Sequence, residues 1–368
     1  MHKLYAVPHS LYAGKVRAYL IKNRIGFHEI SPSHESFRNE VLPESKILTL
    51  PILVTPSGEV IRDGAAILEH FEAANDRPFE PRQPRQQLVS ALFDLVGVEG
   101  LRRPAMHYRW NFPEENQEFL HRHFFDMLRA TPDREQKTEH IMSKLHNVTN
   151  VLGVNEQTAP TVEALYLEFL KALDDHLAQF PYVLGWKPCI GDFGLLAPLY
   201  AHLGRDPYPA DLMRRRAVHV FRWVERMNRA DDDAAEFMNA GSDYLADDRV
   251  PDTIPTALRI LAEEFVPETR AARAYLNDWL ANHQPAAGAA AERRFGAVEF
   301  EVRGTAFTTV LHPYRFFMLQ RVQRIYEAAD AATRKQLLEL LQACGMAELL
   351  ELGLDREVGL VGNLEVWL

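Results

Sequence analysis

The spacing of the apolar residues changes once along this chain, and that change most constrains the fold. In residues 1–76, short strand-like runs alternate with two amphipathic segments in the order strand, helix, strand, loop, strand, strand, helix. Residues 75–86 hold three prolines and few apolar residues, which is typical of a linker. From residue 87 onward, apolar residues recur every three to four positions. The sequence therefore predicts a small sheet covered by helices, followed by an all-helical domain.

A third region begins near residue 243. Two stripes at helical spacing between residues 258 and 280 precede an alanine-rich connection. The segment 297–310 then alternates on both sides of Arg303 and Gly304, which predicts a β-hairpin before two more helical stretches. We expect an α+β protein with a mostly helical C-terminal extension. The expected units are an N-terminal domain, a helical domain and the extension, at 1–76, 87–242 and 243–368.

Charge and composition exclude several classes of partner. The chain carries 41 Lys and Arg against 51 Asp and Glu, a net charge of -10, which argues against general binding of nucleic acid or of acidic membranes. No apolar run approaches the roughly 20 residues of a membrane-spanning helix. Cys189 and Cys344 lie far apart, His121 and His123 lack metal-ligand spacing, and no leader pattern is present. We expect a cytoplasmic protein without a bound metal and with a small-molecule partner.

Ser10 stands where the first short strand passes into the first helix. Serine is a favoured N-cap and stabilises a helix by about 1 kcal/mol in that position. The same hydroxyl can donate to a thiolate, whose negative charge is also favoured by the N-terminal end of a helix. The local sequence leaves both roles open, and Tyr5 and Tyr12 are rival hydroxyls.

Two further positions suit the binding of a peptide-like ligand. Pro51 opens an apolar run, and a cis bond between Leu50 and Pro51 would expose the N–H and C=O of Leu50 to a ligand's backbone. Asp63 precedes the last helix of the N-terminal domain, where it can cap that helix and also face a ligand.

Four short stretches, in order and at the right spacing, resemble motifs of the glutathione transferase superfamily. The matches are Ser10 seven residues before Arg17 of "KVR", Leu50-Pro51 for the family's Val-Pro, "DGAAI" from Asp63 for E-S-x-A-I, and "PCIGDF" from Pro188 for P-S-I-A-D-F. The resemblance covers residues 1 to about 230. It implies a thioredoxin-like N-terminal domain followed by an all-helical domain, in a long form that carries a C-terminal extension.

The resemblance also implies roles for individual residues. Ser10 would stabilise the thiolate of glutathione, the co-substrate, which would lie across Leu50, Pro51, Asp63 and Gly64. Asp63 would accept from the γ-glutamyl ammonium, while the N–H groups of Asp63 and Gly64 would take its carboxylate. Gly64 departs from the family's serine and so lacks a hydroxyl, which weakens this grip.

The segment 105–114 is dense in aromatic and basic residues, early in the helical domain. There the resemblance places the pocket for the second substrate, and the candidates are Tyr12, His107, Tyr108, Arg109 and Trp110. Because consecutive residues face different sides of a helix, two or three of the last four at most can line one pocket.

The sequence favours a glutathione-dependent transferase or lyase whose thiolate attacks a small hydrophobic electrophile, with a homodimer as the family expectation. The alternative is a non-catalytic binding or assembly protein that kept the fold. A thiol-disulfide reductase ranks third, because residue 10 would then need to be Cys. Cys189 is expected to begin a helix in a capping box with Asp192. The extension could cover the pocket, form a lid or occupy the dimerisation surface, and the sequence leaves these open.

Overall fold

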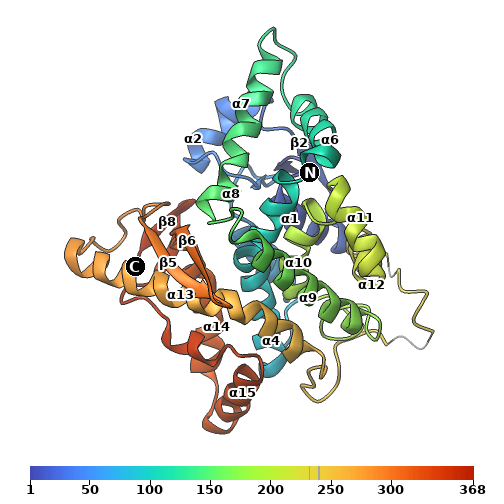
Figure 1. Cartoon of the computed structure of the whole chain (residues 1–368), viewed down its shortest axis with the longest axis vertical. Helices are drawn as coiled ribbons and strands as arrows, with labels where there is room; N and C mark the ends of the chain where they lie inside the picture. Colours follow the sequence, from blue (N-terminus) through green and yellow to red (C-terminus); the bar gives the residue numbers. More distant parts are fainter. Residues whose placement is uncertain (232, 239–240) are drawn as a thin grey trace.

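The computed structural model describes residues 1–231, 233–238 and 241–368, and its elements run as labelled in Figure 1. In the N-terminal domain they are β1 (His2–Tyr5), α1 (Leu11–Lys22), β2 (Phe27–Ile30), η1 (Phe37–Val41), α2 (Leu42–Ser45), β3 (Ile52–Val54), β4 (Val60–Arg62) and α3 (Gly64–Ala74). In the helical domain they are α4 (Pro84–Leu95), η2 (Val96–Gly100), α5 (Arg102–Trp110), α6 (Pro113–Asp126), α7 (Arg134–His146), α8 (Val148–Val151), α9 (Ala159–Leu177), α10 (Ile190–Ala201), α11 (Pro207–Arg216) and α12 (Val218–Met227). In the extension they are α13 (Ile254–His283), β5 (Ala297–Val302), β6 (Thr305–Val310), α14 (Tyr314–Ala328), α15 (Ala331–Ala343), η3 (Ala347–Glu351), β7 (Val358–Val361) and β8 (Leu364–Trp367).

The N-terminal domain is a four-stranded mixed sheet in the order β2-β1-β3-β4. Strand β1 runs parallel to β2 and antiparallel to β3, and β3 pairs antiparallel with β4. Because side chains alternate along a strand, Leu4 and Leu53 enter the main core with α1 and α3, while Tyr5 and Ile52 pack with Phe37 in a smaller cluster. This arrangement confirms the predicted thioredoxin-like domain.

Helix α10 lies at the centre of the helical domain, with contacts to α1 and α4. Its start is the predicted capping box, in which the Cys189 N–H donates to Asp192 Oδ2 at 2.9 Å. Asp192 Oδ1 also accepts from Trp223 Nε1 at 3.0 Å, which fixes the end of the buried helix. A Cβ on Gly97 would lie 2.4 Å from the carbonyl carbon of Gly194, so η2 and α10 pack backbone against backbone.

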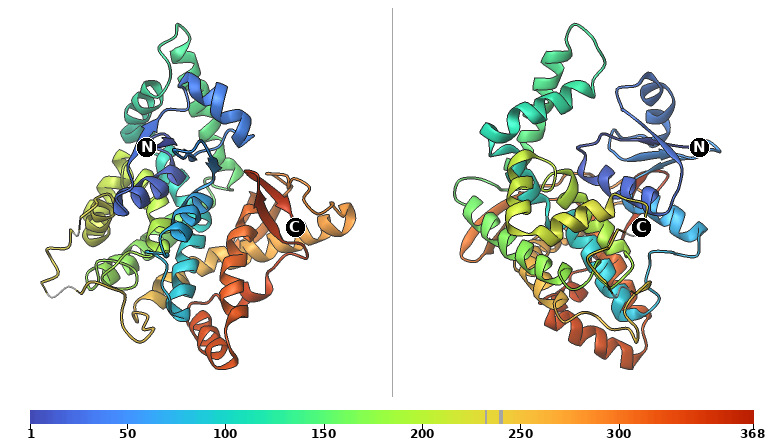
Figure 2. Two further views of the ribbon diagram at one scale, coloured as in Figure 1. Left: turned by 180° about the vertical axis from the view of Figure 1, so that it is seen from behind. Right: turned by 90° about the vertical axis from the view of Figure 1, so that its right-hand side faces the viewer.

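The extension packs along one side of the other two units (Figures 1 and 2). The two stripes expected between residues 258 and 280 lie on one continuous helix, α13, which passes through Pro267. The predicted hairpin is confirmed as β5–β6, and both turn residues, Arg303 and Gly304, have positive φ as a type I′ turn requires. A second hairpin, β7–β8, was not predicted.

The hairpin β7–β8 covers the outer edge of β4, which ends the sheet. Its turn residue Asn363 accepts from the Arg62 N–H at 2.9 Å and donates to the Val60 carbonyl at 3.0 Å. Pairing of this kind protects the polar groups of an edge strand.

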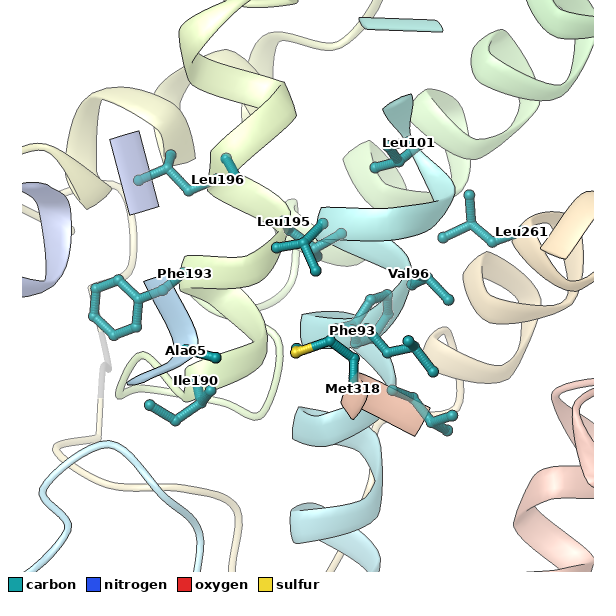
Figure 3. Close-up of a cluster of buried hydrophobic side chains, with 14 of the residues drawn as sticks. Ala65, Phe93, Val96, Leu101, Ile190, Phe193, Leu195, Leu196, Leu261 and Met318 are labelled. Atoms are coloured by element: carbon teal, nitrogen blue, oxygen red, sulfur yellow. The ribbon is translucent and has the colours of Figure 1, made fainter. Parts of the chain in front are cut away.

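One hydrophobic core runs through the three units. Figure 3 shows Ala65 of α3, Phe93 of α4, Phe193 of α10 and Met318 of α14 in the same cluster. The division at 1–76, 87–242 and 243–368 therefore describes chain order, and as a set of separate domains it stays a proposal. Among the described residues, no helix combines the length and apolar character needed to cross a membrane.

Candidate functional site

A cavity of about 470 Å³ lies where the three units meet. The N-terminal domain contributes Ser10, Tyr12, Leu50, Pro51, Asp63 and Gly64 to its wall. The helical domain contributes an apolar wall of Met106, Trp110, Phe124, Leu145, Val148 and Leu152, with Glu99, Arg102 and Arg109 beside it. The extension closes the third side with residues 292–294, 312–314 and Glu365. Of the roles that the sequence left open for the extension, the structure places it over the pocket.

Ser10 is the N-cap of α1, where its Oγ accepts from the Ala13 N–H at 3.4 Å. Accepting this long hydrogen bond leaves the hydroxyl hydrogen free to donate elsewhere. The Arg17 guanidinium holds the turn that carries Ser10, since it donates to the Val7 carbonyl at 3.3 Å and to Glu29 at 2.6 Å. The capping role and a role toward a ligand are therefore compatible.

The rival hydroxyls differ in their surroundings. The Tyr5 side chain is in the core, and its hydroxyl is hydrogen-bonded to Ser36 Oγ at 2.9 Å. Tyr12 lines the cavity, where burial raises the pKa of its hydroxyl to about 12 and the charge of Arg102 opposes this shift. A phenol with this pKa stays protonated at neutral pH, so it can donate a hydrogen bond there but does not act as a base.

The Leu50–Pro51 bond is cis. Within the described part of the chain, the backbone N–H and C=O of Leu50 make no hydrogen bond. The Pro51 carbonyl is engaged, because it accepts from the Asp63 N–H at 3.3 Å. The expectation that the Asp63 N–H binds a ligand carboxylate therefore fails, and Gly64 keeps that role as a prediction.

Asp63 caps α3 through Oδ1, which accepts from the N–H groups of Ala65 at 2.9 Å and Ala66 at 3.1 Å. Its backbone has φ +89°, a conformation that non-glycine residues rarely adopt and that is enriched at functional sites. Burial raises the pKa of Asp63, while hydrogen bonds from Tyr314 and from the Ala66 N–H oppose this shift.

Gly64 follows at the first position of α3. A Cβ built there meets its nearest neighbours, on Lys15 and Val16, at 3.8 Å, which is ordinary van der Waals contact. The packing therefore does not require a glycine at this position, and a serine would fit.

The four candidates on α5 separate into two pairs. Arg109 and Trp110 line the cavity. Arg109 is also a buried clamp, since it pairs with Asp206 at 2.6 Å and donates to the His9 carbonyl at 3.0 Å.

His107 and Tyr108 lie outside the cavity wall. The His107 ring is hydrogen-bonded to Glu163 at 2.8 Å, and Tyr108 stacks on Phe112. The helical rotation of about 100° per residue turns His107 toward α9 and Tyr108 toward Phe112. The prediction that these two residues line the pocket is therefore wrong.

The comparisons with known proteins concern the front of the chain. Residues 4–79 match the family described as the N-terminal domain of glutathione S-transferase. The N-terminal domain of this chain belongs to the glutathione S-transferase superfamily. Among curated proteins, none matches the sequence.

Solved structures of glutathione S-transferases and related proteins are similar to this chain at low identity. One, from Methylobacterium radiotolerans in complex with glutathione sulfonate, is 16% identical over 68% of this chain and 99% of its own, with a TM-score of 0.39. A GST-like protein from Pseudomonas syringae is 16% identical over 84% and 96%, with a TM-score of 0.41. A beta-etherase from Sphingobium is 15% identical over 62% and 94%, with a TM-score of 0.42. Values this low carry no substrate from those proteins to this one.

Several residues of the cavity wall, outside the glutathione S-transferase domain, were not predicted from the sequence. On α5, Arg102, Met106 and Arg109 share one face at helical spacing. Because Arg109 is a candidate from the sequence, the helical period could have identified Arg102 and Met106 as well. Glu99 reaches the cavity from the π-helical turn η2, and Tyr314 arrives from the extension. No pattern in the sequence signals either of these two positions.

The missed residues give the cavity a polar end next to the glutathione S-transferase domain. Arg102 forms an ion pair with Glu99 Oε2 at 3.0 Å. Burial raises the pKa of Glu99, and the charge of Arg102 opposes this rise. The polar end therefore holds an ion pair beside the apolar wall formed by α5 to α8.

Proposed function

We propose that the protein is a glutathione-dependent transferase or lyase that acts on a hydrophobic electrophile. The observation that carries this proposal is one cavity that gathers Ser10, the cis Leu50–Pro51 bond, Asp63 and Gly64, facing an apolar wall. These positions are the ones that the resemblance assigns to glutathione.

In this proposal, the N-terminal domain binds the tripeptide. The Asp63 carboxylate accepts from the γ-glutamyl ammonium, and the Gly64 N–H at the start of α3 donates to the neighbouring carboxylate. The free N–H and C=O of Leu50 pair with the ligand's own backbone. Glutathione is thus the co-substrate, and its thiol lies near Ser10.

The chemistry rests on stabilising the thiolate. A free thiol has a pKa of about 8.5, so only a small fraction is ionised at neutral pH. The Ser10 hydroxyl donates to the sulfur, the N-terminal end of α1 favours the negative charge, and each pKa unit is worth about 1.4 kcal/mol. The sulfur then forms a bond to an electrophilic carbon held against Trp110, Phe124 and their apolar neighbours, and the bond from that carbon to the leaving group breaks.

The first test is calorimetric titration of glutathione into the wild type and into Asp63→Ala. We expect binding by the wild type and its loss in the variant, because the ammonium loses its ionic partner. Asp330→Ala is the matched control, since Asp330 also caps a helix through a backbone N–H, at 2.8 Å, but lies outside the cavity wall. No detectable binding to the wild type at millimolar glutathione would sink the proposal.

The second candidate is a non-catalytic binding protein, which the absence of a hydroxyl at Gly64 favours. A panel of electrophiles separates the two candidates. If the protein is an enzyme, Ser10→Ala raises the pKa of the bound thiol and lowers the transfer rate about tenfold for each unit of that rise. Ser10→Thr keeps the hydroxyl and therefore keeps the rate. For a binding protein, glutathione binds and no electrophile reacts in either variant.

A cytoplasmic location and a homodimer complete the proposal. Since β7–β8 covers the edge of β4, a dimer would have to use another surface. Light scattering on the purified protein measures the oligomeric state directly.

A further inference from the structure

Two arginines of the extension, Arg293 and Arg294, line the cavity and are exposed. Within the described residues, their side chains make no ion pair and no hydrogen bond. The other three arginines of the wall each pair with a buried carboxylate, and the pairs are Arg62–Glu365, Arg102–Glu99 and Arg109–Asp206. Arg293 and Arg294, which we call the arginine rim, therefore remain available to a ligand.

The segment that carries the arginine rim is held by hydrogen bonds on both of its sides. Before the rim, the Ala291 N–H donates to a carbonyl of β8 at 2.8 Å. After it, the Phe295 N–H donates to the Leu311 carbonyl at 3.1 Å, which continues the ladder of the β5–β6 hairpin. The His312 ring also donates to the Arg293 carbonyl, at 2.6 Å. The backbone of the rim is thus a fixed part of the cavity wall.

Positive charge dominates this part of the wall. Burial and the charges of three arginines lower the pKa of His312, which also lines the cavity, to about 3; these arginines are Arg102, Arg294 and Arg293. Glu292 precedes the rim and lines the cavity as well, so the three consecutive side chains carry one net positive charge. A guanidinium can bind a carboxylate through two parallel hydrogen bonds, which makes the rim suited to an organic anion.

The rest of the cavity restricts what that anion can be attached to. The helical domain contributes an apolar wall, which suits an apolar body. The positions proposed for glutathione are Ser10, Leu50, Pro51, Asp63 and Gly64, and all of them lie on the N-terminal domain. The apolar wall and the arginine rim therefore border the space that remains for the second substrate.

We infer that the arginine rim binds a negatively charged group of the second substrate, which is thus a hydrophobic electrophile that carries a carboxylate or a similar anion. This inference rests on the proposed function and gives the extension a part in substrate selection. An uncharged electrophile of the same shape would bind to the apolar wall without the contribution of the rim.

The first experiment measures anion binding without any reaction. The probes are 8-anilinonaphthalene-1-sulfonate and 1-anilinonaphthalene, which share their rings and differ by the sulfonate. Fluorescence titration compares the wild type with Arg293→Gln/Arg294→Gln and with Arg215→Gln/Arg216→Gln. The latter is the matched control, because it removes two adjacent exposed arginines at the end of α11, outside the cavity wall.

We expect the rim variant to bind the sulfonate about tenfold more weakly at low ionic strength, because two charged contacts are lost. Added salt should reduce the difference between the wild type and the rim variant. The uncharged probe should bind equally to all three proteins, and the control variant should bind both probes as the wild type does.

The second experiment measures transfer of glutathione to 4-(bromomethyl)benzoate and to its methyl ester, which share the reacting carbon and the leaving group. For the rim variant, kcat/KM should fall about tenfold with the benzoate through a higher KM and stay unchanged with the ester. Calorimetry should give the same glutathione affinity for the wild type and the rim variant.

Three results would overturn the inference: equal sulfonate binding by the wild type and the rim variant, equal weakening of both probes, or a loss of glutathione affinity in the rim variant. The last result would assign the arginines to a carboxylate of glutathione itself. If the wild type binds no glutathione, the proposed function fails and the second substrate with it. The sulfonate titration needs no glutathione, so it separates that failure from a failure of the rim to bind anions.

Discussion

At the scale of the residue, the proposed site uses hydroxyls and carboxylates that also cap helices. Ser10 caps α1 by accepting from Ala13, and its own hydrogen remains for a sulfur. Asp63 caps α3 with one oxygen and also lines the cavity. In the proposed function, capping and binding use the same geometry, because a helix N-terminus presents donors and positive potential to both.

Gly64 gives a direct test at this scale. Gly64→Ser should tighten glutathione binding several-fold, since one more hydrogen bond contributes about 0.5–1.5 kcal/mol and the Cβ meets ordinary contacts. Gly64→Ala is the matched control, because it adds the Cβ without the hydroxyl and should raise only stability, by about 0.4–1 kcal/mol. Calorimetry and thermal melts measure the two effects, and equal affinity in both variants would contradict the role of the hydroxyl.

The candidate residues could be named from the sequence only as far as local order reaches. Ser10, Pro51 and Asp63 follow from the junctions of strands and helices, which the sequence displays. Whether residues of α5 face the cavity depends on what packs against that helix, so His107 and Tyr108 could not be separated from Arg109 and Trp110 beforehand. Tyr314 lies beyond any local signal.

At the scale of the element, the extension is joined to the helical domain by a buried ionic network. Arg103 of α5 pairs with Glu264 at 2.6 Å and with Glu268 at 2.8 Å, both on α13, and donates to the Leu152 carbonyl at 2.7 Å. Arg315 of α14 also pairs with Glu268. The two arginines hold the pKa of Glu268 well below its usual range.

Loss of one member of this network should be costly. Arg103→Ala is expected to lower the free energy of unfolding by about 3–5 kcal/mol, because buried Glu264 loses its ion pair with Arg103 and Glu268 keeps Arg315 but loses Arg103. Arg270→Ala is the control, since its ion pair with Glu348 is exposed and should contribute about 0–1 kcal/mol. Urea denaturation measures both, and equal losses would show that burial of the network has no energetic consequence.

Elements with a local turn signal could be predicted, and elements shaped by tertiary contacts could not. Arg303-Gly304 within alternating residues predicted β5–β6. The hairpin β7–β8 carries a comparable signal, Gly362-Asn363 with positive φ at both residues, and attention to that turn would have found it. The sequence gives no signal that α13 is continuous, because Pro267 removes a helix hydrogen bond and so predicts an interruption. Buried neighbours such as Phe265 and Glu268 hold the helix together across this residue.

At the scale of the whole molecule, the shared core contains several neutral histidines. Burial lowers the pKa of His176 to about 4 and that of His9 to about 2, and burial also holds the pKa of His202 well below its usual range. In the unfolded chain a histidine titrates near 6.5. The unfolded state therefore binds more protons below that pH, so these residues remove stability as pH falls.

His176→Gln isolates one of these histidines. Between about pH 6.5 and pH 4 the wild type should lose about 3 kcal/mol more unfolding free energy than the variant, since one unit of pKa shift is worth about 1.4 kcal/mol. Urea denaturation at a series of pH values measures the difference, with the exposed His140→Gln as control. Parallel curves for the wild type and His176→Gln would contradict the assignment.

Helix α4 shows what the shared core means for the history of such a chain. It packs against α10, α14 and α15, so its buried residues include polar ones, Gln86, Ser90 and Asp94. A helix covered on several sides has few positions where a substitution is neutral. We therefore expect α4 to tolerate fewer substitutions than the exposed α7, whose buried residue is Thr138. A related protein without the extension would need other residues on the face of α4 that α14 and α15 cover here.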